Sequence, residues 1–160
     1  MYRCDWQNEP RDRHPRSMVL ISPGMRQSYL RFGDLVAFDI TYGLLRNVAH
    51  DSRSYKVGVF TVNDTNLRML FAGIAIFVDE TKQALFTVLD NFIQLHGKAP
   101  ASFISDDQDS VAAAINELSA NQFFNGAHML DPWHLLKAMK RKIPGRIQEA
   151  RLKEIMQLIV

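Results

Sequence analysis

Short apolar runs separated by polar turns fill the first half of the chain. Their length and their content of β-branched and aromatic residues predict strands, and the turn at 63–66 between two of them is of hairpin type. Gly73 interrupts the third run and predicts a bulge. The three predicted strands lie at 35–42, 55–62 and 68–78, after a polar segment at 1–24 that predicts an irregular arm and a short helix or turn at 25–32.

Beyond residue 80 the apolar residues recur at helical spacing. Leu85, Leu89 and Phe92 fall on one face of a helix predicted over 80–96, and Gly97 is a favourable helix end. Because strands that alternate with helices join a sheet in parallel, the pattern predicts a mixed α/β sheet: three antiparallel strands, then alternating parallel strands, with helices on both faces. The later elements are strands at 101–105 and 123–128, a helix that Asp109 or Ser110 is expected to cap, and helices that start at Pro132 and at Arg146.

Two of the predicted strands deliver an aspartate. Asp39 interrupts an apolar run that a sheet normally buries on both faces, and a buried carboxylate costs several kcal/mol, roughly, unless it is paired or holds a cation. Asp106 ends the run at 103–105 in the same way. If the two strands are neighbours, the pair predicts a site for Mg²⁺ or Mn²⁺, which prefer oxygen ligands. In the alternative interpretation, Asp39 faces a solvated strand end or bonds Thr41 or the nearby backbone.

Composition restricts the classes of function. A chain of 160 residues with 47% hydrophobic residues is typical of one globular domain, and it has no apolar run long enough to span a membrane. No secretory signal is visible, and the lone Cys4 excludes an internal disulfide and a cysteine zinc cage. Motifs of nucleotide-binding loops and serine hydrolases are absent. The net charge of +2 is mild, but basic residues gather near the end of the chain, where they could meet phosphate or form a solvated helix face.

Four segments resemble, in order, the motifs of Mutator-like element (MULE) transposases. The stretch at 29–42, with Asp39-Ile40-Thr41-Tyr42, resembles the first-acid motif of that family. The resemblance covers roughly residues 25–143. The segment at 78–81 fits the end of the family's third strand. The segment at 103–106, with the apolar helix that follows it, is similar to the second-acid motif. The segment at 133–137 resembles the one that carries a Cys-x-x-His signature.

The resemblance implies a ribonuclease H-like fold and an Asp-Asp-Glu triad that cleaves and transfers DNA strands with Mg²⁺ or Mn²⁺. Asp39 would be the first acid and Asp106 the second, with Asp107 as the alternative second acid. The implied partners are DNA and further copies of the chain in a transposition complex, and the implied location is the nucleus. The candidates for holding the DNA backbone are Lys137, Lys140, Arg141, Lys142 and Arg146.

The chain departs from the family pattern at two places. Asp131 stands where the signature cysteine is expected, whereas His134 is retained. We therefore do not expect zinc to bind through the Cys-x-x-His signature. Asp131 and His134 could still form a mixed oxygen–nitrogen site with His128, or His134 could simply be a helix histidine satisfied by hydrogen bonds. The third acid of the family lies well downstream and is expected beyond Val160, so we expect a fragment or a decayed copy.

These observations predict an incomplete transposase core at 25–143, an arm at 1–24 and the start of a C-terminal helical segment at 144–160. The first hypothesis is a metal-dependent enzyme of DNA strand cleavage and transfer. The second is a catalytically inactive, transposase-derived module that binds DNA or protein. The third hypothesis is an unrelated α/β metal-binding hydrolase, which would have only the aspartate pair in common with the transposase family.

Overall fold

The computed structural model describes residues 1–6, 15–46, 54–121 and 123–134. Residues 132–134 are helical and end the described part, as predicted for Pro132. The elements of this part follow in the order β1 (Tyr2–Trp6), β2 (Pro15–Leu20), α1 (Pro23–Phe32), β3 (Leu35–Arg46), β4 (Ser54–Asn63), β5 (Met69–Phe77), α2 (Lys82–His96), β6 (Ser102–Ser105), α3 (Asp109–Ala120) and β7 (Ala127–Leu130).

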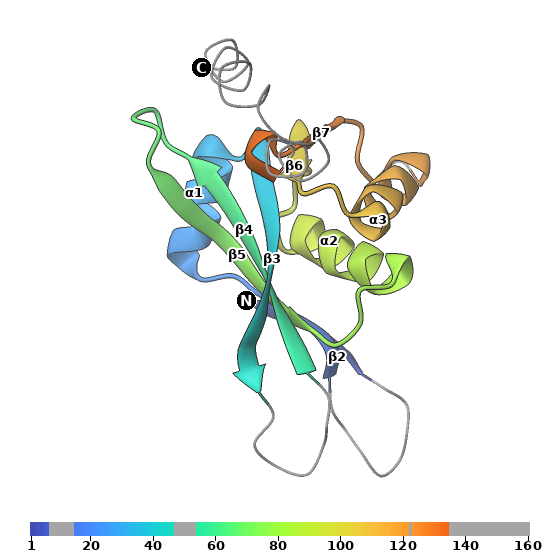
Figure 1. The fold of residues 1–160 in the computed structure, drawn as a ribbon. Helices are drawn as coiled ribbons and strands as arrows, with labels where there is room; N and C mark the ends of the chain where they lie inside the picture. The colour runs from blue at the N-terminus through green and yellow to red at the C-terminus, as the bar shows by residue number, and fades with distance from the viewer. Residues whose placement is uncertain (7–14, 47–53, 122, 135–160) are drawn as a thin grey trace, which may run out of the picture.

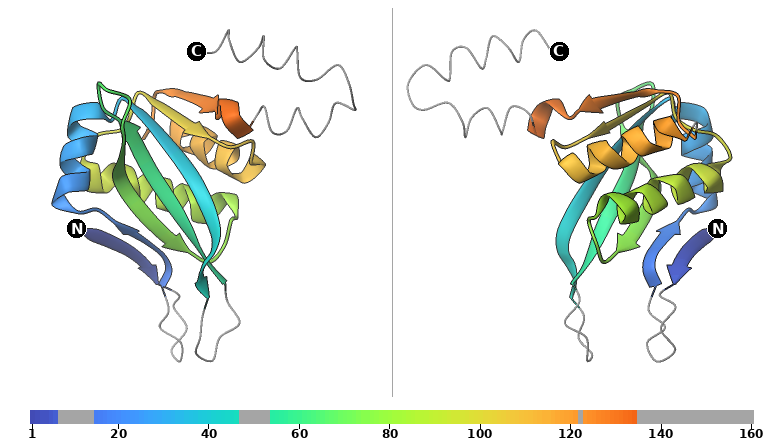
Figure 2. Two further views of the ribbon diagram at one scale, coloured as in Figure 1. Left: turned by 60° about the vertical axis from the view of Figure 1, so that its left-hand side comes forward. Right: turned by 90° about the vertical axis from the view of Figure 1, so that its right-hand side faces the viewer.

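All seven strands join one sheet in the order β1-β2-β5-β4-β3-β6-β7. Strands β3, β4 and β5 pair as an antiparallel meander, and β6 and β7, each preceded by a helix, extend the sheet in parallel beside β3. Helices α2 and α3 lie side by side on one face of this sheet (Figures 1 and 2). The predicted arrangement of three antiparallel strands, alternating parallel strands and flanking helices is therefore confirmed.

The first segment of the chain differs from its prediction. The described parts of residues 1–24, predicted to be irregular, form β1 and β2 and the start of α1. Strand β2 pairs with the edge of β5 and alternates buried Ser17 and Val19 with more exposed neighbours. The ladder with β5 satisfies the backbone hydrogen bonds of β2, and the short apolar run at 18–21 is a local strand signal that the prediction overlooked.

The core lies between the sheet and α2. Phe60 of β4 stacks on Phe92 of α2 with ring centroids 3.9 Å apart, and on Phe38 of β3 at 4.7 Å. The register of β4 and β5 shifts opposite Gly73, which confirms the predicted bulge. A Cβ atom at Gly73 would lie 3.1 Å from the Phe92 ring, so the glycine leaves room for this ring above the bulge.

Side-chain caps explain two of the helix boundaries. Thr81 accepts a hydrogen bond from Ala84 N at the start of α2, and Gly97 ends this helix with a left-handed φ of 75°. Ser22 caps α1 in the same way. Helix α3 begins at Asp109, but its N-cap is Gln108, whose side chain makes no cap hydrogen bond. The prediction of Asp109 or Ser110 as the cap is wrong by one or two residues. The Gln108 side chain does not cap the helix because it donates a hydrogen bond to Glu80 instead.

Gly126, which lies just before β7, is expected to tolerate no side chain. A Cβ atom there would lie 2.1 Å from the carbonyl oxygen of Ala101 and 2.5 Å from the Phe124 ring. Because the nearest atom is backbone, Gly126→Ala should push β7 away from β6 and lower the free energy of unfolding by about 2 kcal/mol. Urea denaturation measures this loss. Gly24→Ala is the matched control, since its Cβ would meet nothing nearer than 3.8 Å, and an equal loss in both variants would contradict the expectation.

Candidate functional site

The two predicted acids lie at the same level of two neighbouring strands, where β6 ends and β3 continues. Strands β3 and β6 pair in parallel with Phe38 opposite Ser105 as the last pair, so Asp39 and Asp106 directly follow this pair. Backbones of paired strands lie about 4.8 Å apart. The sequence could not show that these strands are neighbours, and the structure brings both aspartates to the same level of the sheet.

The Asp39 side chain is exposed, and the prediction that its strand is buried on both faces is wrong. Along β3 the buried residues are Val36, Phe38 and Ile40, and Asp39 alternates with them. Asp39 therefore points to the face of the sheet opposite the core. The alternative, that it faces solvent at a strand end, describes its exposure correctly, and this exposure leaves both of its oxygens accessible to a ligand.

Asp106 is half-buried and surrounded by negative charge. Burial raises the pKa of Asp106, and the His134 ring opposes this rise. The charges of Asp39, Asp107 and Glu80 add to the raised pKa. No ion pair between described residues involves Asp39 or Asp106, so a cation at this point would relieve the repulsion among these carboxylates.

A third carboxylate, Glu80, lies between β5 and α2 and is held by three cationic or polar groups. Its Oε2 accepts hydrogen bonds from Tyr42 OH at 2.7 Å and from Gln108 Nε2 at 2.6 Å. Its Oε1 lies 3.4 Å from Nζ of Lys56, which also donates to the Val78 carbonyl at 2.6 Å. We did not predict this cluster, although Tyr42 and Glu80 both lie inside segments that resemble family motifs.

The charges of this cluster are set by its hydrogen bonds. Partial burial opposes ionisation of Glu80, but the hydrogen bonds from Tyr42, Gln108 and Lys56 outweigh it and lower the pKa of the carboxyl. Desolvation, together with the hydrogen bond to Glu80, raises the pKa of Tyr42 to about 12, and the charges of Asp106 and Asp39 contribute to this shift. Glu80 is thus an ionised carboxylate near the aspartate pair, and Tyr42 a neutral hydroxyl donor.

Asp131 and His134 form a hydrogen-bonded pair in the segment after β7. Asp131 Oδ2 lies 3.1 Å from Nδ1 of His134, and Asp131 Oδ1 accepts from Trp133 N at 2.7 Å. His128 does not join them, because its Nε2 lies 2.9 Å from Ser105 Oγ on the adjacent strand, and burial lowers its pKa. The bond to Asp131 agrees with the alternative that His134 is a helix histidine satisfied by hydrogen bonds.

The donor set at the strand ends fits a magnesium-type ion in part. Two carboxylates at one level supply the oxygen ligands such an ion takes, together with water and substrate phosphate. Within the described ranges, no three His, Cys, Asp or Glu side chains gather closely enough to form a metal cage. Asp39 and Asp106 would therefore hold the ion as a pair. The predicted DNA-backbone residues, Lys137, Lys140, Arg141, Lys142 and Arg146, all lie outside the described residues.

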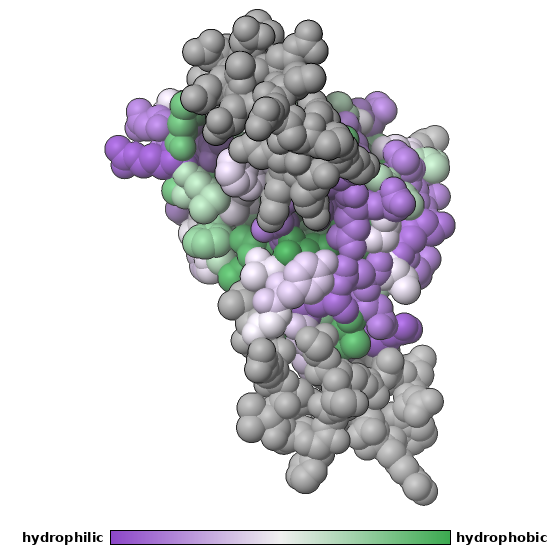
Figure 3. All heavy atoms as spheres, in the orientation of Figure 1, coloured by the Kyte–Doolittle hydropathy of each residue, from purple (hydrophilic) through white to green (hydrophobic). Residues whose placement is uncertain are grey.

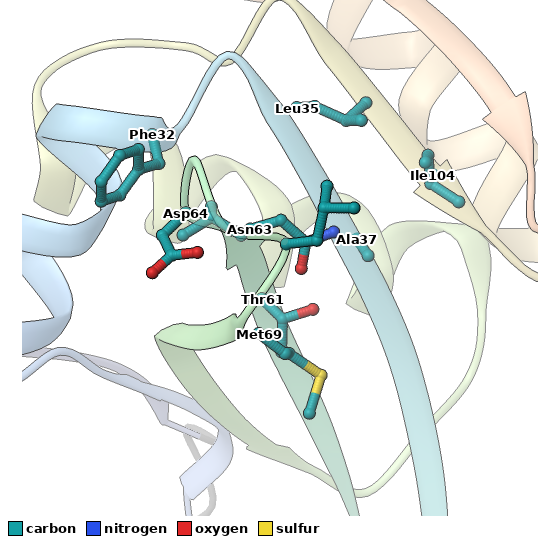
Figure 4. A pocket seen from close by; sticks show the side chains of 10 residues that line it. Phe32, Leu35, Ala37, Thr61, Asn63, Asp64, Met69 and Ile104 are labelled. Carbon is teal, nitrogen blue, oxygen red and sulfur yellow. The ribbon is translucent and has the colours of Figure 1, made fainter.

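A pocket of about 400 Å³ opens on the same face of the sheet, two residues before Asp39 along β3 (Figure 4). Leu35, Ala37 and Ile104 line one side of it. Asp64 is the one titratable side chain in its lining, and its Oδ1 already accepts from Asn66 N and Arg68 N within the β4–β5 turn. Apolar residues also gather near the centre of the surface seen in Figure 3. Most of the other side chains in the lining of the pocket are apolar.

Comparison with known proteins gives two similarities. The chain is 27% identical over 134 residues to the Arabidopsis thaliana protein named FAR-RED IMPAIRED RESPONSE 1; the match covers 83% of this chain but 14% of that protein. The HTLV-2 integrase catalytic core domain, solved in complex with magnesium in a trimeric form, aligns with a TM-score of 0.42 at 12% identity, over 75% of this chain and 80% of that one. No family model matches the chain. None of its described helices is long and apolar enough to cross a membrane.

Proposed function

We propose that this chain is the core of a MULE-type transposase, with Asp39 and Asp106 as the first two acids of a metal-dependent site for DNA strand cleavage and transfer. The observation that supports this most directly is the parallel pairing of β3 and β6, whose register brings Asp39 and Asp106 to the same level of the sheet. The negative charges of Asp39, Asp107 and Glu80 around half-buried Asp106 favour a cation at this point.

Each residue has a distinct role in this proposal. Asp39 offers exposed oxygens, and half-buried Asp106 supplies the second carboxylate from the adjacent strand. Magnesium, when bound, would stabilise the negative charge that develops on the phosphodiester during in-line attack. Asp107 is exposed and follows Asp106 directly, so it stays the alternative second acid. DNA and further copies of the chain would be the partners, and the nucleus the location.

A catalytically inactive module that binds DNA or protein is the second candidate. It is favoured by the observation that the described ranges contain two close carboxylates but no third metal ligand beside them. In that case the aspartate pair would be retained without chemistry. The two candidates differ in whether the folded chain takes up a divalent ion at these two residues.

Titration of the folded chain with Mn²⁺ by calorimetry tests the proposal. We expect the parent chain to bind Mn²⁺, and Asp39→Asn and Asp106→Asn each to weaken binding at least tenfold, because either change removes one of two anionic ligands. Asp107→Asn should have little effect if Asp106 is the second acid, and the larger effect if the assignment is off by one residue.

Asp34→Asn is the matched control for charge. Asp34 is a highly exposed aspartate that pairs with Lys98 at 3.2 Å at the beginning of β3, five residues before Asp39. Circular dichroism should show the same fold in every variant. A chain that takes up no Mn²⁺, or one whose uptake is indifferent to both Asp39→Asn and Asp106→Asn, would contradict the enzyme proposal and favour the binding module.

A further inference from the structure

The strand ladder stops one residue short of the two acids. Its last pair is Phe38 with Ser105, and Asp39 and Asp106 lie beyond it. Two carboxylates at the same level of adjacent strands repel each other when no cation lies between them. Strand β3 continues past Asp39 in its ladder with β4, whereas β6 ends before Asp106, so side-chain contacts are needed to hold the loop after Asp106 at a set distance from β3.

Glu80 links these two segments through one oxygen atom. Tyr42, which donates to Oε2 at 2.7 Å, comes three residues after Asp39 on β3. Gln108, which donates to the same oxygen at 2.6 Å, comes two residues after Asp106. The bridge therefore spans from β3 to the β6–α3 loop on the far side of the acids from the ladder, so that each acid is held from both directions along the chain.

The Glu80 carboxylate is itself firmly placed. Its side chain is 21% exposed, and Lys56, which is 22% exposed, lies 3.4 Å from Oε1 while bonding the Val78 carbonyl two residues before Glu80. Thr81, the next residue, caps α2. With both donors on Oε2 and the ammonium beside Oε1, the oxygens of Glu80 are occupied, and this occupancy favours a supporting role over direct metal ligation.

We propose that Glu80 is a positioning residue, which fixes the separation of Asp39 and Asp106 through Tyr42 and Gln108. This inference rests on the proposed function, since it concerns the geometry of the proposed metal site. It extends that site from two acids to a second layer of three polar residues that touch neither the ion nor the DNA. In metal sites, partners of this second layer commonly change affinity on the order of tenfold or more.

The test compares Mn²⁺ affinity, measured by calorimetry, across variants of the 160-residue chain. Glu80→Ala removes the bridge and should weaken Mn²⁺ binding on the order of tenfold, whereas Glu80→Gln keeps an oxygen that can accept both hydrogen bonds and should lose about threefold or less. Tyr42→Phe and Gln108→Leu each remove one donor and no carboxylate. Each should weaken binding, and the double variant should lose less than the product of the two, because both act through one oxygen.

Thermal unfolding of each variant separates positioning from loss of fold, and affinities are compared only between folded chains. Equal losses in Glu80→Gln and Glu80→Ala, with Tyr42→Phe and Gln108→Leu silent, would overturn the inference, because they would make Glu80 a direct ligand. Unchanged affinity in all four variants would overturn it as well. Absence of Mn²⁺ binding in the parent chain would instead refute the proposed function, and this inference with it.

Discussion

Phe92→Ala should remove about 4 kcal/mol from the free energy of unfolding. The Phe92 side chain is fully buried, and its ring contacts three others: it stacks on Phe60 at 3.9 Å and meets Tyr29 and His96 edge-on at 5.3 and 4.6 Å. Truncation would leave a cavity at the centre of the core, where the sheet cannot close around it. Because single domains are stable by only about 5–15 kcal/mol, a loss of this size should be visible as a large shift of the urea midpoint.

Phe123→Ala is the matched control for this loss. Phe123 lies in the loop after α3 and is 45% exposed, so the same truncation there should cost less than about 1 kcal/mol. Equal midpoints for Phe92→Ala and the parent chain would show that α2 does not pack on the sheet as described. An equal shift in both variants would show that the truncation acts through the unfolded chain instead of the core.

Much of the fold could be predicted because local sequence patterns indicate its elements. The helix α2 combines apolar spacing with a threonine cap and a glycine stop, and all three signals agree with the observed bounds. The bulge at Gly73 was predicted from one residue, since glycine in a strand interior has few other uses. Where local pattern and tertiary packing agree, the sequence is enough.

The elements that were missed depend on partners distant in sequence. Strand β2 exists because the edge of β5, nearly sixty residues later, offers a ladder to Ser17 and its neighbours. The exposure of Asp39 was misjudged because an apolar run on a strand does not reveal which of its faces the rest of the chain covers. In both cases the deciding contact joins residues whose neighbourhood no local window contains.

The candidate site divides in the same way. Asp39 and Asp106 could be found from sequence because each ends an apolar run with a charge, and the family resemblance named them independently. The cluster around Glu80 could not, because its three donors come from β3, β4 and the β6–α3 loop, and each is an ordinary polar residue in its own segment. Residues that support a site in this way are recognised by their meeting at one carboxylate, and only the folded chain brings them together.

The strand order also explains why convergence occurs at this point. Strands β3 and β6 are neighbours although α2 and two strands separate them in sequence, so residues 39–42 of β3 and the turns that follow β5 and β6 meet at one region of the sheet. Strand β3 is the first strand of the antiparallel meander, and β6 is the first parallel strand added beside it. Their pairing thus brings together charged residues from distant segments. This arrangement supplies the aspartate pair and its supporting carboxylate with a common scaffold.

Acidification should destabilise the fold through His96. This side chain is 2% exposed, stacks on Tyr29 with centroids 3.9 Å apart, and its Nε2 lies 3.1 Å from the Ala72 carbonyl, so Nε2 carries the proton and Nδ1 has no partner among the described residues. Burial lowers the pKa of His96 to about 4, the Ala72 hydrogen bond opposes this shift, and Arg26 adds to it. In the unfolded chain His96 therefore binds a proton below about pH 6.5, whereas in the folded chain it binds one only below about pH 4.

The contribution of His96 to stability is consequently complete above about pH 6.5 and falls by about 3 kcal/mol as the pH drops to about 4, below which it changes no further. Urea denaturation of the parent chain and of His96→Gln at matched pH values isolates this dependence, because glutamine can still donate to Ala72 but does not titrate. The difference in free energy of unfolding between the two chains should shrink steadily over this window. A difference that stays constant from pH 7 to pH 4 would mean that His96 is protonated in the fold, and that the packing of Tyr29 and Phe92 against its ring accommodates the charge.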